Sequence, residues 1–473
     1  MNVLIIQPPD PEPAVADLEP TPEDCQVFAP PWSLLCLQSY LRERTRHVGH
    51  VLDTRLYSSV ERELVEAISA IPEPRFAAIN TATFGLGQTA GILEILSRYF
   101  PKIRTAVFGE HPSRFPEHAL IARTEFAIAG DPEPILRNLL DNLDIEPRLQ
   151  LIPGLIYDRQ PKASASWLPS LKALSLPDWS DTFWPSYSLS SSKHALRASI
   201  RLSRGHTHQP ADRAWGGQSE PLREWSFEQC ARNIQQCSGL GITDVLVADP
   251  PGFWTPSRLH RWCSVLRHSR NSQPWSLLLL PLAADADIVS DLHSARCTRV
   301  QFLVPSCDPD MLEQYGCTVD GRDMAHTVTL FRQQGISVHV RFWVGGPEEH
   351  HGEYARIGKF LRAIGSHCSF SLQPFPLKLD APLCTGDSSL PAPSIETWME
   401  WAWDPWTRER PIPCWAEEEG ASYMEYAMAR VYRRALRNPN RWVQRTLRAL
   451  SARNWFEEVE GKLLGLFGKP RES

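Results

Sequence analysis

The sequence predicts an α/β protein with two parallel-sheet domains and a helical C-terminal region. Short apolar strands alternate with amphipathic helices up to about residue 376, and this alternation is typical of parallel sheets. A stretch rich in Pro and Trp, residues 169–187, divides the alternation into two series. We therefore expect a first domain at 1–145, a connector at 146–197, a second domain at 198–376 and a Trp-rich helical region at 377–473.

Composition narrows the class of protein. The 473 residues are 42% hydrophobic and 22% charged, which is ordinary for a soluble chain with two or three domains. The net charge of −6 gives no basic field that would recruit nucleic acid. No apolar run reaches the ~20 residues of a membrane span, and the chain enters a strand without a leader-like segment. The expected location is the cytoplasm.

The 11 cysteines are scattered, and no two are spaced as Cys-x-x-Cys. An odd count in a large α/β chain does not suggest a disulfide framework. Most of them are expected to be small buried apolar side chains.

The first domain reads as an open parallel sheet, flavodoxin-like or Rossmann-like. A helix is expected to begin at Pro31, with Leu34, Leu37 and Leu41 on one apolar face. The expected strands are Asn2–Gln7, His50–Asp53, Phe76–Asn80, Thr105–Phe108 and Glu125–Ala129.

Ligands of such sheets bind beyond the carboxyl ends of the strands. The segments that fall there are Pro8-Pro9, Thr81–Gly85, Gly109–His111 and Gly130–Glu133. Small residues let a backbone approach a ligand, and Thr hydroxyls can donate to it. No Gly-x-Gly-x-x-Gly follows the first strand, so a dinucleotide is not expected. The residues alone indicate a small-molecule crevice.

The second domain reads as a β/α barrel, in which the loops after the strands carry the chemistry. Its first strand, Ala198–Ser203, alternates apolar and polar residues and leads to a turn at Gly205. The other expected strands are Asp244–Ala248, Ser276–Leu280, Arg299–Val304, Ser337–Val344 and Ser369–Gln373, and the expected helices are Phe227–Cys237, Pro256–Arg267, Pro309–Tyr315 and Met324–Gln334.

The stretch Ala198–Arg213 resembles the cluster-binding loop of the radical S-adenosylmethionine (SAM) enzymes, in particular the subgroup with an N-terminal cobalamin-binding domain. In that family Ser-Arg-Gly leads into Cys-x-x-x-Cys-x-x-Cys, whose thiolates hold a [4Fe-4S] cluster. The frame Ser203-Arg204-Gly205 is intact here, but the three cysteine positions read His206, Pro210 and Arg213. The resemblance implies a Rossmann-like cobalamin-binding domain followed by a partial (β/α)6 barrel.

Further landmarks of the family follow in order. Val247-Ala-Asp249 with Phe253 resembles the end of the second barrel strand, and Ser306–Glu313 resembles the helix entry after the fourth. The likeness extends over roughly Met1–Pro376. The cobalamin contacts that it implies are Pro8, Pro9, Thr81, Thr83, Phe84, Gly109, Glu110, His111, Gly130, Asp131 and Glu133.

The sequence lacks an Asp-x-His-x-x-Gly segment, so no histidine is expected below cobalt. His111 is interpreted as a turn residue rather than a cobalt ligand. The alternative is that all these loops are ordinary turns of a sheet that has lost its ligand.

The sequence differs from the family at the positions that would bind the iron–sulfur cluster and SAM. A [4Fe-4S] cluster needs soft thiolate ligands, whereas Pro210 has no donor atom and Arg213 is a permanent cation. His206 alone cannot hold four irons, so the cluster is predicted to be absent. Pro305 stands where the family has a Glu that often contacts SAM, which puts SAM binding in doubt.

Two other features have alternative interpretations. His206, His208 and Asp212 form a candidate mononuclear metal site, but a solvated loop is the preferred interpretation. The basic tract Tyr423–Leu450 is interpreted as a solvated face packed on its own domain rather than a peripheral membrane contact.

Three functions follow, none with an identified catalytic residue. The first is a cobalamin-binding, radical-SAM-like pseudoenzyme without a cluster, acting without radical chemistry or as a partner subunit of an intact paralogue. The second is an active cobalamin-dependent methyltransferase that uses polar methyl transfer. The third is a scaffold that binds neither cofactor.

Overall fold

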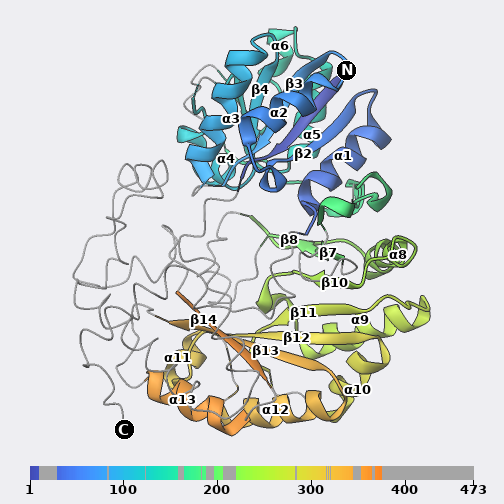
Figure 1. Cartoon of the computed structure of the whole chain (residues 1–473), viewed down its shortest axis with the longest axis vertical. Coiled ribbons are helices and arrows are strands. Elements are labelled where there is room, and N and C mark those ends of the chain that lie inside the picture. Colours follow the sequence, from blue (N-terminus) through green and yellow to red (C-terminus); the bar gives the residue numbers. More distant parts are fainter. Residues whose placement is uncertain are drawn as a thin grey trace, which may run out of the picture.

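The computed structural model contains two α/β units stacked along its long axis (Figure 1). The Trp-rich C-terminal region, Thr83, Phe84 and the positions 206–219 lie outside the described residues. The residues described are 1–9, 29–82, 85–122, 124–157, 164–182, 184–187, 196–205, 220–282, 285–315, 317, 319, 321–344, 353–364 and 368–374.

The first unit is built on a six-stranded sheet in the order β2-β1-β3-β4-β5-β6. All neighbouring strands are parallel except β6, which runs antiparallel to β5 and extends the sheet beyond residue 145. The five parallel strands are those that the sequence predicts, to within two residues at each end. The strands are β1 (Asn2–Gln7), β2 (Val48–Asp53), β3 (Pro74–Asn80), β4 (Arg104–Phe108), β5 (Phe126–Ile128) and β6 (Leu155–Tyr157).

Helices cover both faces of this sheet. α1 (Trp32–Arg44) and α5 (Pro132–Asp141) share an apolar cluster with one face, and α2 (Val60–Ser69) and α3 (Leu86–Tyr99) share a cluster with the other. Two short helices, α4 (Glu110–Arg114) and α6 (Glu146–Leu149), complete the unit. The result is the three-layer doubly wound fold that alternating strands and helices predict.

The helix α1 belongs to the cores of both units. Leu34, Leu37 and Leu41 face the first sheet, as the sequence pattern indicates. Trp32 and Cys36 on the opposite side pack into the apolar core of the second unit. The helix is therefore buried on two opposite sides, and these sides face two different sheets.

The second unit is a six-stranded parallel sheet in the order β14-β13-β12-β11-β10-β7, so each strand lies beside its successor along the chain. This is the strand order expected of a partial β/α barrel. The strands are β7 (Arg197–Ile200), β10 (Asp244–Val247), β11 (Trp275–Leu279), β12 (Cys297–Val304), β13 (Ser337–Val344) and β14 (Ser369–Pro374).

The expected strand Ala198–Ser203 is wrong at its end. β7 stops at Ile200, and Ser203–Arg204 forms a separate strand, β8, paired antiparallel with β9 (Arg223–Glu224). The reason is that the Asp249 carboxylate takes the backbone N–H groups of Leu202 and Ser203 out of the sheet ladder.

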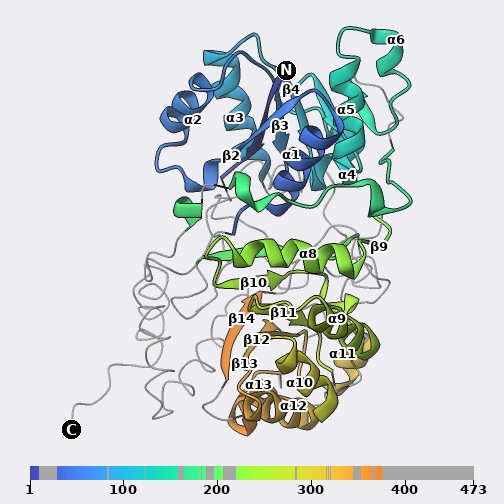
Figure 2. The ribbon, with the colours of Figure 1, turned by 90° about the vertical axis from the view of Figure 1, so that its right-hand side faces the viewer.

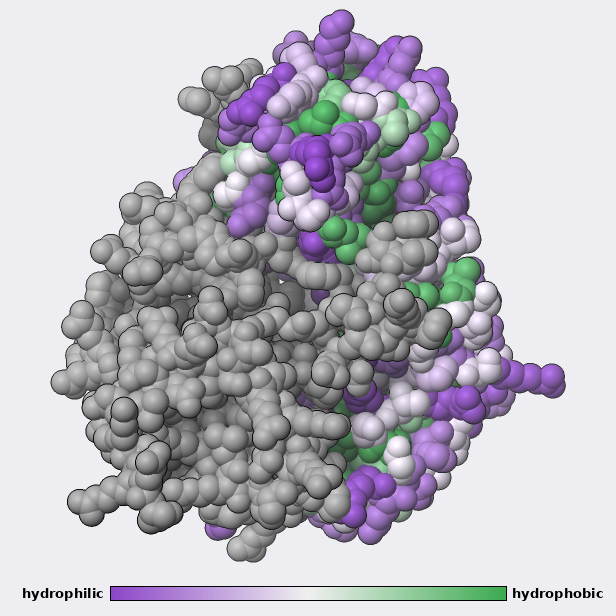
Figure 3. All heavy atoms as spheres, in the orientation of Figure 1, coloured by the Kyte–Doolittle hydropathy of each residue, from purple (hydrophilic) through white to green (hydrophobic). Residues whose placement is uncertain are grey.

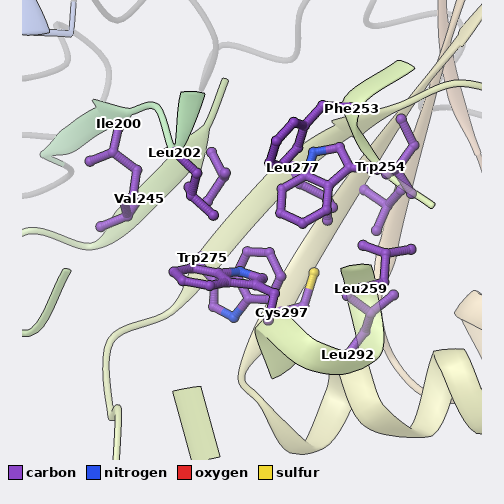
Figure 4. Close-up of a cluster of buried hydrophobic side chains, with 14 of the residues drawn as sticks. Ile200, Leu202, Val245, Phe253, Trp254, Leu259, Trp275, Leu277, Leu292 and Cys297 are labelled. Atoms are coloured by element: carbon purple, nitrogen blue, oxygen red, sulfur yellow. The ribbon is translucent and has the colours of Figure 1, made fainter. Parts of the chain in front are cut away.

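Helices cover one face of the second sheet and share its apolar core. Figure 4 shows Ile200, Val245 and Leu277 of the strands in the same cluster as Leu259 and Leu292 of the helices. Asp308 caps α11 (Pro309–Gln314) through the N–H groups of Asp310 and Met311, and Pro309 is the first helical residue, where the sequence predicts that the helix begins. The helices that share this core are α8 (Phe227–Ser238), α9 (Pro256–His268), α10 (Ala286–Ser294), α12 (Gly321–Gln333) and α13 (Glu353–Ile364). In contrast, α11 packs its Met311 and Leu312 in a separate apolar cluster with Leu278 and Leu303 of the strands.

The Pro- and Trp-rich connector packs against both units. Leu171, Trp179 and Trp184 are buried in the core of the second unit. The Trp179 indole donates to Asn233 Oδ1 of α8 at 3.1 Å, and Tyr187 donates to Asp53 Oδ2 of β2 at 2.9 Å. Figure 2 shows α8 running along the side of the second unit that faces the first.

The described surface is mostly polar on the face seen in Figure 3, with small apolar areas. Within the part of the chain that the structure describes, no helix has both the length and the apolarity to cross a membrane.

Candidate functional site

The carboxyl ends of β1, β3, β4 and β5 form one edge of the first sheet, called here the carboxyl edge, and it faces the second unit (Figure 1). The strand order reverses between β1 and β3, the switch point where doubly wound sheets bind ligands. Asn80 donates to Gln7 Oε1 across this point at 2.8 Å. Sequence reasoning missed both residues, although each is the last residue of a predicted strand.

The turn after β4 is hydrogen-bonded to the turn after β3. Thr81 is fully buried; its N–H donates to Phe108 O at 2.7 Å, and its carbonyl accepts from His111 N–H at 3.0 Å. Gly109 has φ +111°, and a Cβ there would collide with Asn80 Oδ1 and the Thr81 backbone. The glycine is therefore required by the protein's own packing.

His111 points into the first unit. It is fully buried, its Nε2 lies 3.4 Å from the His118 carbonyl, and its ring packs on Phe115. Burial lowers the pKa of His111 to about 4, so the ring is neutral at pH 7. His111 lies in the short helix α4, directly after the turn at Gly109.

The turn after β5 contacts the second unit. Gly130 has φ +109° and lies against the Ser166 backbone, where a Cβ would overlap the carbonyl. Asp131 and Glu133 follow, and their side chains are 1% and 0% exposed. Two acids so deeply buried need cationic partners.

Arg204 and Arg223 are those partners. Arg204 forms a two-pronged ion pair with Glu133, with NH1 2.9 Å from Oε2, and lies 3.4 Å from Asp131 Oδ1. Arg223 pairs with Asp131 Oδ2 and, at 2.7 Å, with Glu220. We call Asp131, Glu133, Arg204 and Arg223 the clamp. It joins the turn after β5 to both strands of the β8–β9 pair.

Aromatic side chains surround Arg204. Its guanidinium lies 5.4 Å from the Trp225 ring centroid and 5.9 Å from that of Trp32, and the two rings meet edge to face. Burial opposes its charge, but Glu133 holds the Arg204 pKa above its ordinary value. Beside it, burial raises the pKa of the Cys36 thiol well above its usual range.

Asp249 holds the start of the β8 strand. Its buried carboxylate accepts from Leu202 N–H at 3.0 Å, from Ser203 N–H at 2.8 Å and from Ser203 Oγ at 2.6 Å. Burial raises its pKa to about 6, although these hydrogen bonds act in the opposite direction. Gly205 follows with φ +88°, packed against the Pro221 carbonyl.

The remaining predicted site residues are dispersed. Pro8 is buried, Pro9 is partly exposed, and Glu110 is exposed at the start of α4, where it pairs with Arg114 at 3.2 Å. His206, His208, Pro210, Asp212 and Arg213 lie outside the described residues, as do Thr83 and Phe84. Among the residues that the structure describes, no three His, Cys, Asp or Glu side chains gather as a metal site.

The fold is similar to that of solved cobalamin-dependent radical SAM enzymes. The radical SAM methyltransferase TsrM from Kitasatospora setae, with tryptophan and a SAM analogue bound, matches at TM-score 0.61 and 18% identity, over 83% of this chain and 77% of TsrM. The cobalamin-dependent SAM radical enzyme OxsB, with aqua-cobalamin and SAM bound, matches at TM-score 0.55 and 16% identity, over 85% of this chain and 55% of OxsB. At these identities the likeness concerns the fold alone. No family model and no curated protein matches the sequence.

Proposed function

We propose that this chain is a cobalamin-binding protein of radical-SAM fold that works without a [4Fe-4S] cluster. It acts through non-radical chemistry or as the partner subunit of an intact paralogue. The supporting observation is the match, over 83% of the chain, to a TsrM structure that holds cobalamin and a [4Fe-4S] cluster, set against the side chains that stand at the cluster positions here.

The donor set does not fit a cluster. Pro210 offers no side-chain donor and Arg213 offers a cation, so only His206 remains at the three positions. Of the cysteines that the structure describes, only Cys307 is more than slightly exposed, and the others belong to apolar cores. Without a bound cluster, reductive cleavage of SAM has no electron donor in this chain.

The donor set fits cobalamin in part. The carboxyl edge carries the hydrogen-bonded pair Asn80 and Gln7 at the switch point, with Pro9 and Glu110 in the segments that follow β1 and β4, and the second unit faces that edge (Figure 1). His111 is turned inward, and Asp131 and Glu133 are paired with arginines. A bound corrin would supply a cobalt centre that can carry a methyl group, and the carboxyl edge would hold it and exclude water.

A second candidate is a cobalamin-dependent methyltransferase that uses polar methyl transfer. TsrM, the first structure compared above, is a methyltransferase whose structure contains tryptophan. In this candidate the second unit would hold the methyl acceptor.

A third candidate is a scaffold that binds neither cofactor. The observation in its favour is that the glycine turns at Gly109 and Gly130 close on the protein's own backbone. Such turns need no ligand to explain them.

Anaerobic reconstitution with hydroxocobalamin, iron and sulfide tests the three candidates. We expect a corrin absorption spectrum with cobalt near one equivalent per chain, background iron and acid-labile sulfide, and no deoxyadenosine from SAM under dithionite. Absence of bound cobalt would support the scaffold. Stoichiometric iron and sulfide with deoxyadenosine formation would reject the proposal, and methyl release from methylcobalamin to an acceptor would favour the second candidate.

A further inference from the structure

We infer that Arg204 and Arg223 are positioning residues that fix the β8–β9 pair, called here the loop base, on the first unit without any metal. The strands β8 and β9 flank residues 205–222 in the sequence, and they pair with each other: Ser203 with Glu224, and Arg204 with Arg223. The paired arginines point to the same turn of the other unit. The inference stands whether or not cobalamin binds.

The contacts at the loop base are buried and mutually dependent. The side chains of Arg204 and Arg223 are 11% and 4% exposed, and those of Asp131 and Glu133 are 1% and 0%. Arg223 also donates to the Leu168 carbonyl of the connector at 3.1 Å. Removing one partner would leave an uncompensated charge in the interior, which is among the costly changes in a protein.

Each residue of the Ser203-Arg204-Gly205 frame has a contact that involves no iron. Ser203 donates to Asp249, Arg204 pairs with Glu133, and Gly205 packs on the Pro221 carbonyl. The frame therefore has a structural role at the joint between the units. In a chain whose cluster positions carry no thiolate, this role is sufficient to hold the loop base in place.

Cys36 provides a local probe of this joint. It is fully buried on α1, close enough to Arg204 to interact with its guanidinium. Cys263 of α9 is equally buried in the core of the second unit, away from the clamp. Opening of the joint exposes Cys36 and leaves Cys263 protected, whereas global unfolding exposes both thiols.

The experiment compares alkylation rates of individual cysteines, read by peptide mass spectrometry, in the full chain and in the variants Glu133→Gln and Arg204→Gln. Loss of Arg204 by itself makes the Cys36 thiol less acidic, and loss of Glu133 makes it more acidic, so direct electrostatic effects on reactivity have opposite signs. Opening predicts that both variants speed Cys36 alkylation by about 10- to 100-fold, with Cys263 unchanged.

Two further measurements complete the test. Arg98→Gln, which breaks an exposed pair with Glu61, is the matched control and is expected to leave the Cys36 rate unchanged. Hydrogen exchange of the peptides that contain β8 and β9 should speed up in Asp131→Asn, which releases Arg223. Unchanged Cys36 alkylation in both clamp variants, or parallel acceleration of Cys36 and Cys263, would overturn the inference.

Discussion

At the scale of single residues, two buried histidines, one in each unit, make folding sensitive to acid. Burial lowers the pKa of His111 to about 4 and that of His339 to about 3. The unfolded chain binds more protons than the folded one between each lowered value and about 6.5, so stability falls as pH falls through this window. The rise in the pKa of Asp249 to about 6 acts oppositely, favouring the folded state as pH falls towards about 4.

His111→Gln tests this pH dependence. Glutamine keeps an Nε2–H donor for the His118 carbonyl but does not titrate. Between pH 6.5 and pH 4, the free energy of unfolding of the variant should therefore fall by up to about 3 kcal/mol less than that of the unmodified protein. Urea unfolding at a series of pH values measures it. His293→Gln, at an exposed site on α10, is the control. A pH profile of His111→Gln that runs parallel to that of the unmodified protein would contradict the assignment.

At the scale of elements, a glycine can be required because its φ is positive or because a Cβ would collide with a neighbour, and comparing Gly205 with Gly241 distinguishes these two requirements. Gly205 and Gly241 both have positive φ, +88° and +73°, but a Cβ would overlap Pro221 only at Gly205 and would meet open space at Gly241. Both alanine variants carry the conformational cost of about 1 kcal/mol, and Gly205→Ala adds the steric displacement of the loop base. We expect Gly205→Ala to unfold at lower denaturant concentration than Gly241→Ala. Equal denaturation midpoints for the two variants would show that Gly205 and Pro221 can move apart at no cost, which would contradict the steric requirement.

The sequence predicts the elements well because their signals are local. Alternation of apolar strands and amphipathic helices places the parallel strands of both sheets, and the Asp308-Pro309 pair marks the start of α11. The end of β7 and the β8–β9 pair escape prediction because Asp249, which is distant in sequence, sets them. The candidate site is harder still. Asp131 and Glu133 read as ligand-binding turn residues until their partners Arg204 and Arg223 are placed beside them.

At the scale of the whole molecule, the apolar cores of the two units are joined through α1 and the connector. α1 contributes Leu37 to the first sheet and Trp32 to the core of the second unit, and the connector packs Trp179 against α8. Independent domains usually meet through smaller, more polar surfaces. The described units are therefore expected to unfold together in one transition.

Calorimetry of the full chain tests this coupling. Substituting Trp32→Ala removes ring contacts with Trp225 and Arg204 and leaves the first-sheet face of α1 intact. Truncating a buried tryptophan costs about 3–5 kcal/mol, so the variant should lower the melting temperature of the second unit and separate the single transition into two. Arg104→Gln is the control: it removes a partly exposed ion pair with Glu125 at the amino end of β4, opposite to the carboxyl edge, and it should leave one transition. Two transitions already present in the unmodified chain would mean that α1 and the clamp join the units too weakly to couple their folding.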